Sequence, residues 1–178
     1  MDESGIYMLN QLPLSDVRNG FLRCCGSQKF AEGLAEKLPF RSVEFLLAEA
    51  HSLWWVLKES EWRMAFEAHP RIGDKEALRK KFAHSEWEKS EQSGAENASN
   101  DVIQQLEQWN IEYEAKFGYV FLICATGKSA EDMLNSLLER YPNDPDTEIR
   151  IAASEQEKIT RLRLLKFLSS LSITSSRL

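Results

Sequence analysis

Apolar residues recur at three- and four-residue steps along nearly the whole chain, and this helical period restricts the possible folds more than any other feature. After Ser42 the steps join Val43, Leu46, Leu47, Ala50, Leu53, Trp54 and Leu57. Only Tyr119–Ala125 has the continuous apolar character of a strand, and one strand cannot form a sheet. The pattern predicts an all-α, single-domain helical bundle of about eight helices, with the domain at residues 1–168 and a flexible tail at 169–178.

Three serines mark expected helix starts. Ser42 precedes the first long apolar stripe and is a favourable N-cap residue. Ser85 with Glu88, and Ser129 with Asp132, have the spacing of a capping box, in which two side chains and two backbone amides pair reciprocally. The sequence therefore predicts helices beginning next to each of these serines.

Prolines and glycines mark the expected breaks. The amphipathic segment 61–68 ends at His69, because the residue before Pro70 is forced out of the helical conformation. A weak point is expected at Ser93–Gly94, and Gly118 is placed to end the following long helix. The apolar run after Gly118 is expected to be a buried extended segment or a short helix.

The last helix is predicted from about Asp146 to Leu168. Arg163 lies one turn after Ile159 and one turn before Phe167, so it projects near the apolar side of this helix. A guanidinium in that position needs a partner. It either forms a buried ion pair with a core carboxylate or binds a ligand.

Composition and charge exclude several classes of protein. The 178 residues carry a formal net charge of -6, which argues against nucleic-acid binding. No apolar run is long enough to span a membrane. The three cysteines are Cys24, Cys25 and Cys124; their odd number and the lack of a C-x-x-C spacing indicate a reducing, intracellular compartment. Ser176-Arg177-Leu178 resembles a peroxisomal tripeptide, with the cytoplasm as the alternative location.

The sequence contains few candidates for a metal or cofactor site. His51, His69 and His84 lack the spacing of paired metal ligands, and there is no glycine-rich phosphate loop or dinucleotide fingerprint. We therefore expect no metal and no cofactor. His69 beside Pro70 is either a catalytic imidazole or a histidine that stabilises a helix C-terminus. Glu91 is either functional or one acidic residue of a solvated face.

Four segments together resemble the 2-oxo-4-hydroxy-4-carboxy-5-ureidoimidazoline (OHCU) decarboxylase family. The segment 66–73 (FEAHPRIG) is similar to the site loop of that family, and 90–95 (SEQSGA) is similar to its E-Q-S-x-A signature. The segment 110–125 (NIEYEAKFGYVFLICA) resembles a longer family stretch, and 158–164 (KITRLRL) resembles the terminal helix with its functional arginine. Each motif is weak by itself, but the four occur in the family's order.

The resemblance implies a cofactor-free, stereoselective decarboxylation of OHCU to (S)-allantoin in urate degradation. It places His69, Glu91 and Arg163 in the catalytic set. It also implies a substrate-binding set consisting of Pro70, Glu88, Lys89, Ser90, Gln92, Phe121, Leu122, Ile123, Cys124 and Ala125. Family members are usually homodimers. In the plant-type branch, which this sequence resembles most, the domain is often fused to a transthyretin-like 5-hydroxyisourate hydrolase.

Two alternative functions come from other classes. A non-catalytic helical interaction module would expose tryptophans among Trp54, Trp55, Trp62, Trp87 and Trp109 as a binding face. A cyclic-amide hydrolase would use His69 and Glu91 to activate water. Only the decarboxylase releases CO2, so product analysis separates it from the hydrolase.

Overall fold

A computed structural model of the chain describes residues 3–69 and 92–175, without the side chains of 92–100 and 173–175. These residues form eight helices and no strand, which confirms the predicted all-α class. The chain divides into two compact units: residues 1–68 with 153–178, and residues 69–152. The predicted domain boundary at residue 168 stays a prediction, and each unit is described by itself.

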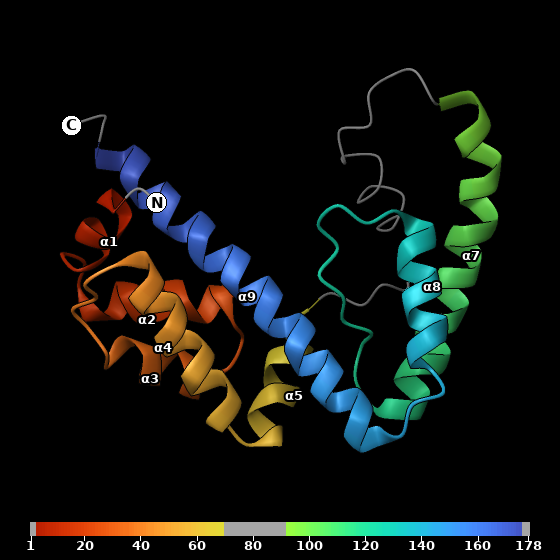
Figure 1. Ribbon diagram of the computed structural model, residues 1–178, viewed down its shortest axis with the longest axis horizontal. Coiled ribbons are helices and arrows are strands. Elements are labelled where there is room, and N and C mark those ends of the chain that lie inside the picture. The colour runs from red at the N-terminus through yellow and green to blue at the C-terminus, as the bar shows by residue number, and fades with distance from the viewer. Residues whose placement is uncertain (1–2, 70–91, 176–178) are drawn as a thin grey trace. The chain divides into compact units, whose positions relative to one another are not determined.

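Unit 1 contains five short helices and most of the last helix (Figure 1). The short helices are α1 (Ser4–Leu9), α2 (Leu14–Cys24), α3 (Gln28–Ala35), α4 (Val43–Val56) and α5 (Glu59–Glu67). The last helix, α9 (Pro145–Ser175), contributes its residues from Ala153 onward. Helix α3 packs against both α2 and α4. The short connections between these helices leave little irregular backbone in the unit.

Trp54 on α4 is at the centre of the unit 1 core. Its ring meets Phe30 of α3 edge-to-face, and its indole N–H donates to the carbonyl of Ala153 at 3.0 Å. Trp62 of α5 packs on the same ring and donates its own indole N–H to the Trp54 carbonyl at 3.0 Å. A buried indole needs a hydrogen-bond acceptor. These two bonds therefore connect α4 with α9 and with α5.

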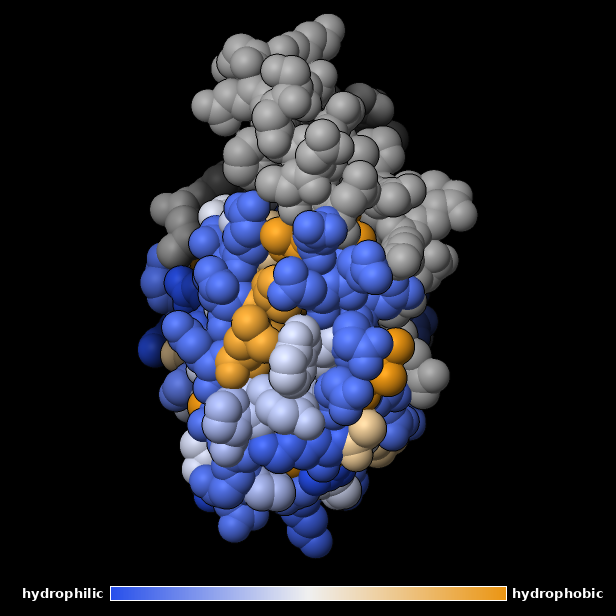
Figure 2. All heavy atoms as spheres, turned by 90° about the vertical axis from the view of Figure 1, so that its right-hand side faces the viewer, coloured by the Kyte–Doolittle hydropathy of each residue, from blue (hydrophilic) through white to orange (hydrophobic). Residues whose placement is uncertain are grey.

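Unit 2 contains α7 (Gln92–Phe117), α8 (Ala130–Arg140) and the first turns of α9. Helices α7 and α8 pack against each other. Figure 2 shows the face that carries these two helices as mostly hydrophilic, with a narrow hydrophobic strip. Ile111 and Leu138 are the exposed large hydrophobic side chains described in this unit. Both helices are thus amphipathic, with their apolar sides turned inward.

The predicted helix starts agree with the structure wherever it describes them. The Ser42 hydroxyl accepts from the amide of Phe45 at 3.1 Å and begins α4. Ser129 and Asp132 form the reciprocal capping box at the start of α8. The predicted start at Ser85 lies outside the described residues. Gly118 ends α7 with a φ of 77°, a conformation that glycine adopts without strain.

One helix prediction was wrong: helix α9 continues to Ser175 rather than ending near Leu168. The hydroxyls of Ser169 and Ser170 donate to carbonyls one turn back, which lets serines occupy a helix interior. The weak point expected at Ser93–Gly94 stays a prediction, because α7 begins at Gln92 and the residues before it lie outside the described part of the chain. The flexibility proposed for residues 169–178 stays a prediction. In the described part of the chain, no helix has the length and apolar character required to cross a membrane.

We predict that Ser42→Ala lowers the free energy of unfolding by about 1 kcal/mol, because the N-terminal amides of α4 lose their side-chain acceptor. Urea denaturation followed by circular dichroism measures this change. Ser52→Ala, an exposed position in the same helix, is the control and should cause no loss. Equal losses in the two variants would contradict the capping role.

Candidate functional site

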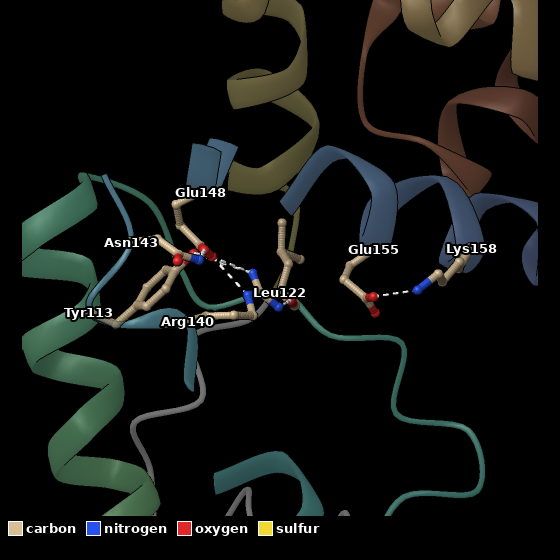
Figure 3. Close-up of polar contacts among 7 residues, drawn as sticks. All are labelled: Tyr113, Leu122, Arg140, Asn143, Glu148, Glu155 and Lys158. Carbon is tan, nitrogen blue, oxygen red and sulfur yellow. Dashed lines mark hydrogen bonds and ion pairs between the residues drawn. The ribbon is translucent and has the colours of Figure 1, made fainter. Parts of the chain in front are cut away.

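A buried ion pair joins α8 and α9 in unit 2 (Figure 3). Arg140, at the end of α8, donates from Nε and Nη2 to one carboxylate oxygen of Glu148 on α9, at 2.8 and 2.6 Å. Glu148 is completely buried, and Arg140 is 9% exposed. Removing two charges from water is costly unless every donor and acceptor finds a partner. The remaining polar atoms of the pair are therefore expected to be bonded.

The other polar atoms of this pair do have partners. Tyr113 of α7 donates its hydroxyl to the Glu148 oxygen that Arg140 also contacts, and Asn143 donates to the second oxygen at 2.9 Å. Burial is the largest of several effects that raise the pKa of Tyr113 far above its usual range, so its hydroxyl stays protonated and remains a donor. The network joins α7, α8 and α9 through charge-assisted hydrogen bonds.

The third donor of Arg140 reaches the segment that follows α7. Its Nη1 donates to the main-chain carbonyl of Leu122 at 2.7 Å, and its guanidinium carbon lies 4.5 Å from the centre of the Phe121 ring. The segment 120–125 has no regular secondary structure, while Phe121, Leu122 and Ile123 are buried. Of the two forms expected for this run, a buried extended segment or a short helix, the structure shows no helix at 120–125. Arg140 supplies a bond that a helix or sheet would otherwise provide.

Sequence analysis did not identify Arg140 and Glu148 as important residues. A signal for Arg140 was present, because it continues the buried stripe of Met133 and Leu137 on α8 at helical spacing. Glu148 likewise lies one turn before the buried Ala152. Charged residues in an apolar stripe indicate a buried pair, but the spacing alone does not identify the two partners.

His69 lies just after α5. Two features fix α5 in unit 1: a polar contact and a close approach between two residues. The hydroxyl of Ser27, the N-cap of α3, donates to the buried carboxylate of Glu61 on α5 at 3.0 Å. A Cβ at Gly26 would lie 2.4 Å from the Cβ of Ala68, so only glycine fits there. The residue before His69 thus lies close to Gly26, and His69 itself is half-buried.

Arg163 of α9 lies beside two buried cysteines of unit 1. Burial raises the pKa of Cys24 and of Cys25 to about 11, and the nearby charge of Arg163 opposes this rise at both thiols. Arg163 is half-buried and has no hydrogen bond or ion pair with any residue that the structure describes. Two roles were considered for Arg163: an ion pair with a buried carboxylate, or a contact with a ligand. No carboxylate among the described residues forms that ion pair.

Several predicted site residues lie outside the described residues. They are Pro70, Glu88, Lys89, Ser90 and Glu91. Gln92 begins α7, and its side chain is not described. In the substrate-binding segment, Phe121, Leu122 and Ile123 are buried, and Cys124 and Ala125 are half-buried.

Unit 1 also has a hollow of about 450 Å³ between α3, α4 and α9. His51 and Glu157 pair at its rim, and Trp55 donates to the same carboxylate at 2.9 Å. None of the predicted catalytic residues lines this hollow. Within residues 3–69 and 92–175, no three side chains of the metal-binding types lie close enough together to hold an ion.

The comparisons with known proteins agree with this fold and this set of segments. The family model "OHCU decarboxylase" matches residues 10–165, which include residues of both units. The chain belongs to the OHCU decarboxylase family.

Individual relatives support the same assignment. The uric acid degradation bifunctional protein TTL of Arabidopsis thaliana is 41% identical over 82% of this chain. The OHCU decarboxylase of Mus musculus is 25% identical over 74% of each chain. A crystal structure of an OHCU decarboxylase in the presence of (S)-allantoin is 38% identical, with a TM-score of 0.67, over 84% of this chain and 96% of that one. The chain spans 45% of the Arabidopsis protein, so it matches less than half of that relative.

We predict that Glu148→Gln destabilises the protein by about 3 kcal/mol or more, because it leaves the Arg140 guanidinium buried without a countercharge. Urea denaturation measures the effect. Lys158→Gln is the control, since it breaks the Glu155–Lys158 pair on the same helix, where the lysine is largely exposed (Figure 3). That pair should contribute about 0.5 kcal/mol or less. A small loss in Glu148→Gln would contradict the central position of the buried pair.

Proposed function

We propose that this chain decarboxylates OHCU to (S)-allantoin in the degradation of urate. The observation that carries the proposal is the family match across residues 10–165. The 38% identical decarboxylase structure obtained with (S)-allantoin supports the same substrate and product. The curated relatives named as OHCU decarboxylases and uric acid degradation proteins are consistent with this step.

The reaction can proceed without an added electron sink. When the bond between the carboxyl group and the ring carbon breaks, CO2 leaves and its bonding electron pair stays on the ring. The adjacent C=N bond of the substrate accepts that pair, a role that a bound cofactor fills in many other decarboxylases. The nitrogen of that C=N bond takes up a proton, and the 4-hydroxyl loses its proton as it becomes a ring carbonyl. A proton delivered to one face of the adjacent ureido-bearing carbon then completes (S)-allantoin. The protein needs to orient the substrate, polarise it and supply that proton.

Three side chains are proposed for these tasks. His69 hydrogen-bonds the substrate hydroxyl or ring edge and takes part in proton transfer, for which an imidazole is suited near neutral pH. Glu91 orients His69 or acts next to the leaving carboxylate. Arg163 binds an anionic or carbonyl oxygen in bidentate fashion. Its lack of a partner among the described residues supports a ligand role.

We predict that His69→Ala and Glu91→Ala fold normally but produce no excess of (S)-allantoin over the spontaneous reaction, which gives the racemate. Each group is expected to contribute about 10²- to 10⁴-fold in rate. The assay follows the optical activity of allantoin formed from freshly generated OHCU. His51→Ala is the control, because His51 lies at the rim of the separate hollow. Full stereoselective activity in either test variant would disprove the role of that residue.

We predict that Arg163→Gln raises KM for OHCU by about 10- to 100-fold, the expected effect of losing a charge-assisted hydrogen bond to the substrate. Steady-state kinetics of the same reaction measure the change. Arg161→Gln, an exposed arginine two residues earlier on α9, should leave KM unchanged. Matching effects of the two substitutions would indicate a general loss of positive charge rather than a specific contact.

The two alternative functions make different predictions. The interaction module required exposed tryptophans, but Trp54 and Trp62 are buried and Trp55 and Trp109 are half-buried; Trp87 lies outside the described residues. The cyclic-amide hydrolase would consume substrate without releasing CO2, so CO2 measured alongside allantoin distinguishes it.

Partners and location remain part of the proposal. A homodimer is proposed from the family resemblance, and sedimentation of the purified chain tests it. The bifunctional relatives support a functional or fused partnership with a 5-hydroxyisourate hydrolase. Where Leu178 is the natural end of the chain, Ser176-Arg177-Leu178 directs the protein to the peroxisome. Imaging the cellular location of the chain with and without this tripeptide tests whether it is a targeting signal.

A further inference from the structure

We infer that Arg140 is a positioning residue for substrate binding: it fixes the Leu122–Ile123 peptide so that the Ile123 amide donates to a carbonyl oxygen of the substrate. This inference rests on the proposed decarboxylase function and goes beyond it, because it assigns a role to the buried pair of unit 2. All of the contacts that carry it lie within that unit.

The geometry of the peptide group links Arg140 to the amide. A trans peptide is planar, and its C=O and N–H point in opposite directions. Arg140 Nη1 holds the Leu122 oxygen at 2.7 Å. The N–H of the next residue, Ile123, must therefore point away from Arg140. A guanidinium fixed in position thus determines the direction of a main-chain donor that it does not touch.

That donor has no acceptor among the residues that the structure describes. No backbone or side-chain hydrogen bond is formed by the Ile123 amide in this part of the chain, although Ile123 is only 9% exposed. Buried amides without a partner are rare in native proteins, because desolvation of the group costs free energy. An acceptor supplied by a ligand satisfies this amide. The ureido and ring carbonyls of OHCU and of (S)-allantoin are acceptors of the required kind.

The guanidinium is suited to this task because it is held from several sides. Glu148 accepts two of its hydrogen bonds, and the Phe121 ring lies 4.5 Å from its central carbon. The Tyr113 hydroxyl lies 3.4 Å from Nη2. The planar fork of an arginine can contact Glu148 and Leu122 together, whereas a lysine ammonium is a single point of charge. The inference therefore requires an arginine at position 140, and a positive charge alone is not sufficient.

Arg140→Lys tests the inference in the full chain. The hydrogen bond from Ile123 is made in the ground state and in the transition state, so its loss should raise KM about tenfold and change kcat less than about twofold. Loss of folded protein lowers the apparent kcat and leaves KM unchanged, which separates positioning from stability. Lys116→Met is the matched control: Lys116 holds the carbonyls of Tyr141 and Asn143 in the same unit and does not contact Leu122. An unchanged KM in Arg140→Lys, or an equal rise in Lys116→Met, overturns the inference.

A second measurement keeps the test decisive if Arg140→Lys fails to fold. The wild-type chain, labelled with [15N]isoleucine, is titrated with (S)-allantoin, and Ile123→Val identifies the Ile123 amide signal by its disappearance. We expect that signal to shift and saturate with the product. A signal that stays in place while other isoleucine signals move overturns the inference. Failure of the wild-type chain to decarboxylate OHCU would instead disprove the proposed function, so the two failures are distinguishable.

Discussion

The Arg140–Glu148 pair is the interaction on which the described part of unit 2 depends. It joins the ends of α7, α8 and the beginning of α9, and it supports a buried segment that has no regular secondary structure. A buried ion pair is weak evidence for stability, because desolvation offsets much of the attraction between the charges. The pair matters because its hydrogen bonds are directional: the guanidinium nitrogens donate, and the carboxylate oxygens accept, only along certain directions. The Leu122 carbonyl is held in place by that constraint.

Much of the fold could be predicted because helix ends are determined locally. Ser42, the Ser129–Asp132 pair and Gly118 act through hydrogen bonds and backbone angles within a few residues, so their effect can be read from the sequence. The end of α9 was placed too early because serines are weak helix formers. Bonds from their hydroxyls to carbonyls one turn back, as at Ser169, accommodate them in the helix.

The candidate site was less predictable because its contacts join residues far apart in the sequence. His69 and Arg163 stood out by their positions beside Pro70 and on an apolar helix side, but their catalytic roles came from the family resemblance, because no local rule assigns them. The link between Arg140 and Leu122 spans 18 residues and depends on the packing of α8. For Arg163, the position near an apolar helix side indicated that some partner was needed. Periodicity cannot tell whether that partner is a carboxylate, a carbonyl or a ligand.

Burial of Cys24 and Cys25 has a consequence for the chemistry of this region. The thiolate is the form of cysteine that attacks peroxides and disulfides, and a rise in pKa from 9.0 to about 11 reduces its population at neutral pH about 100-fold. Arg163 would by itself favour the thiolate, but desolvation outweighs it. The neighbouring sulfur atoms therefore resist oxidation, and a positive charge can be kept next to them without creating a redox-sensitive centre.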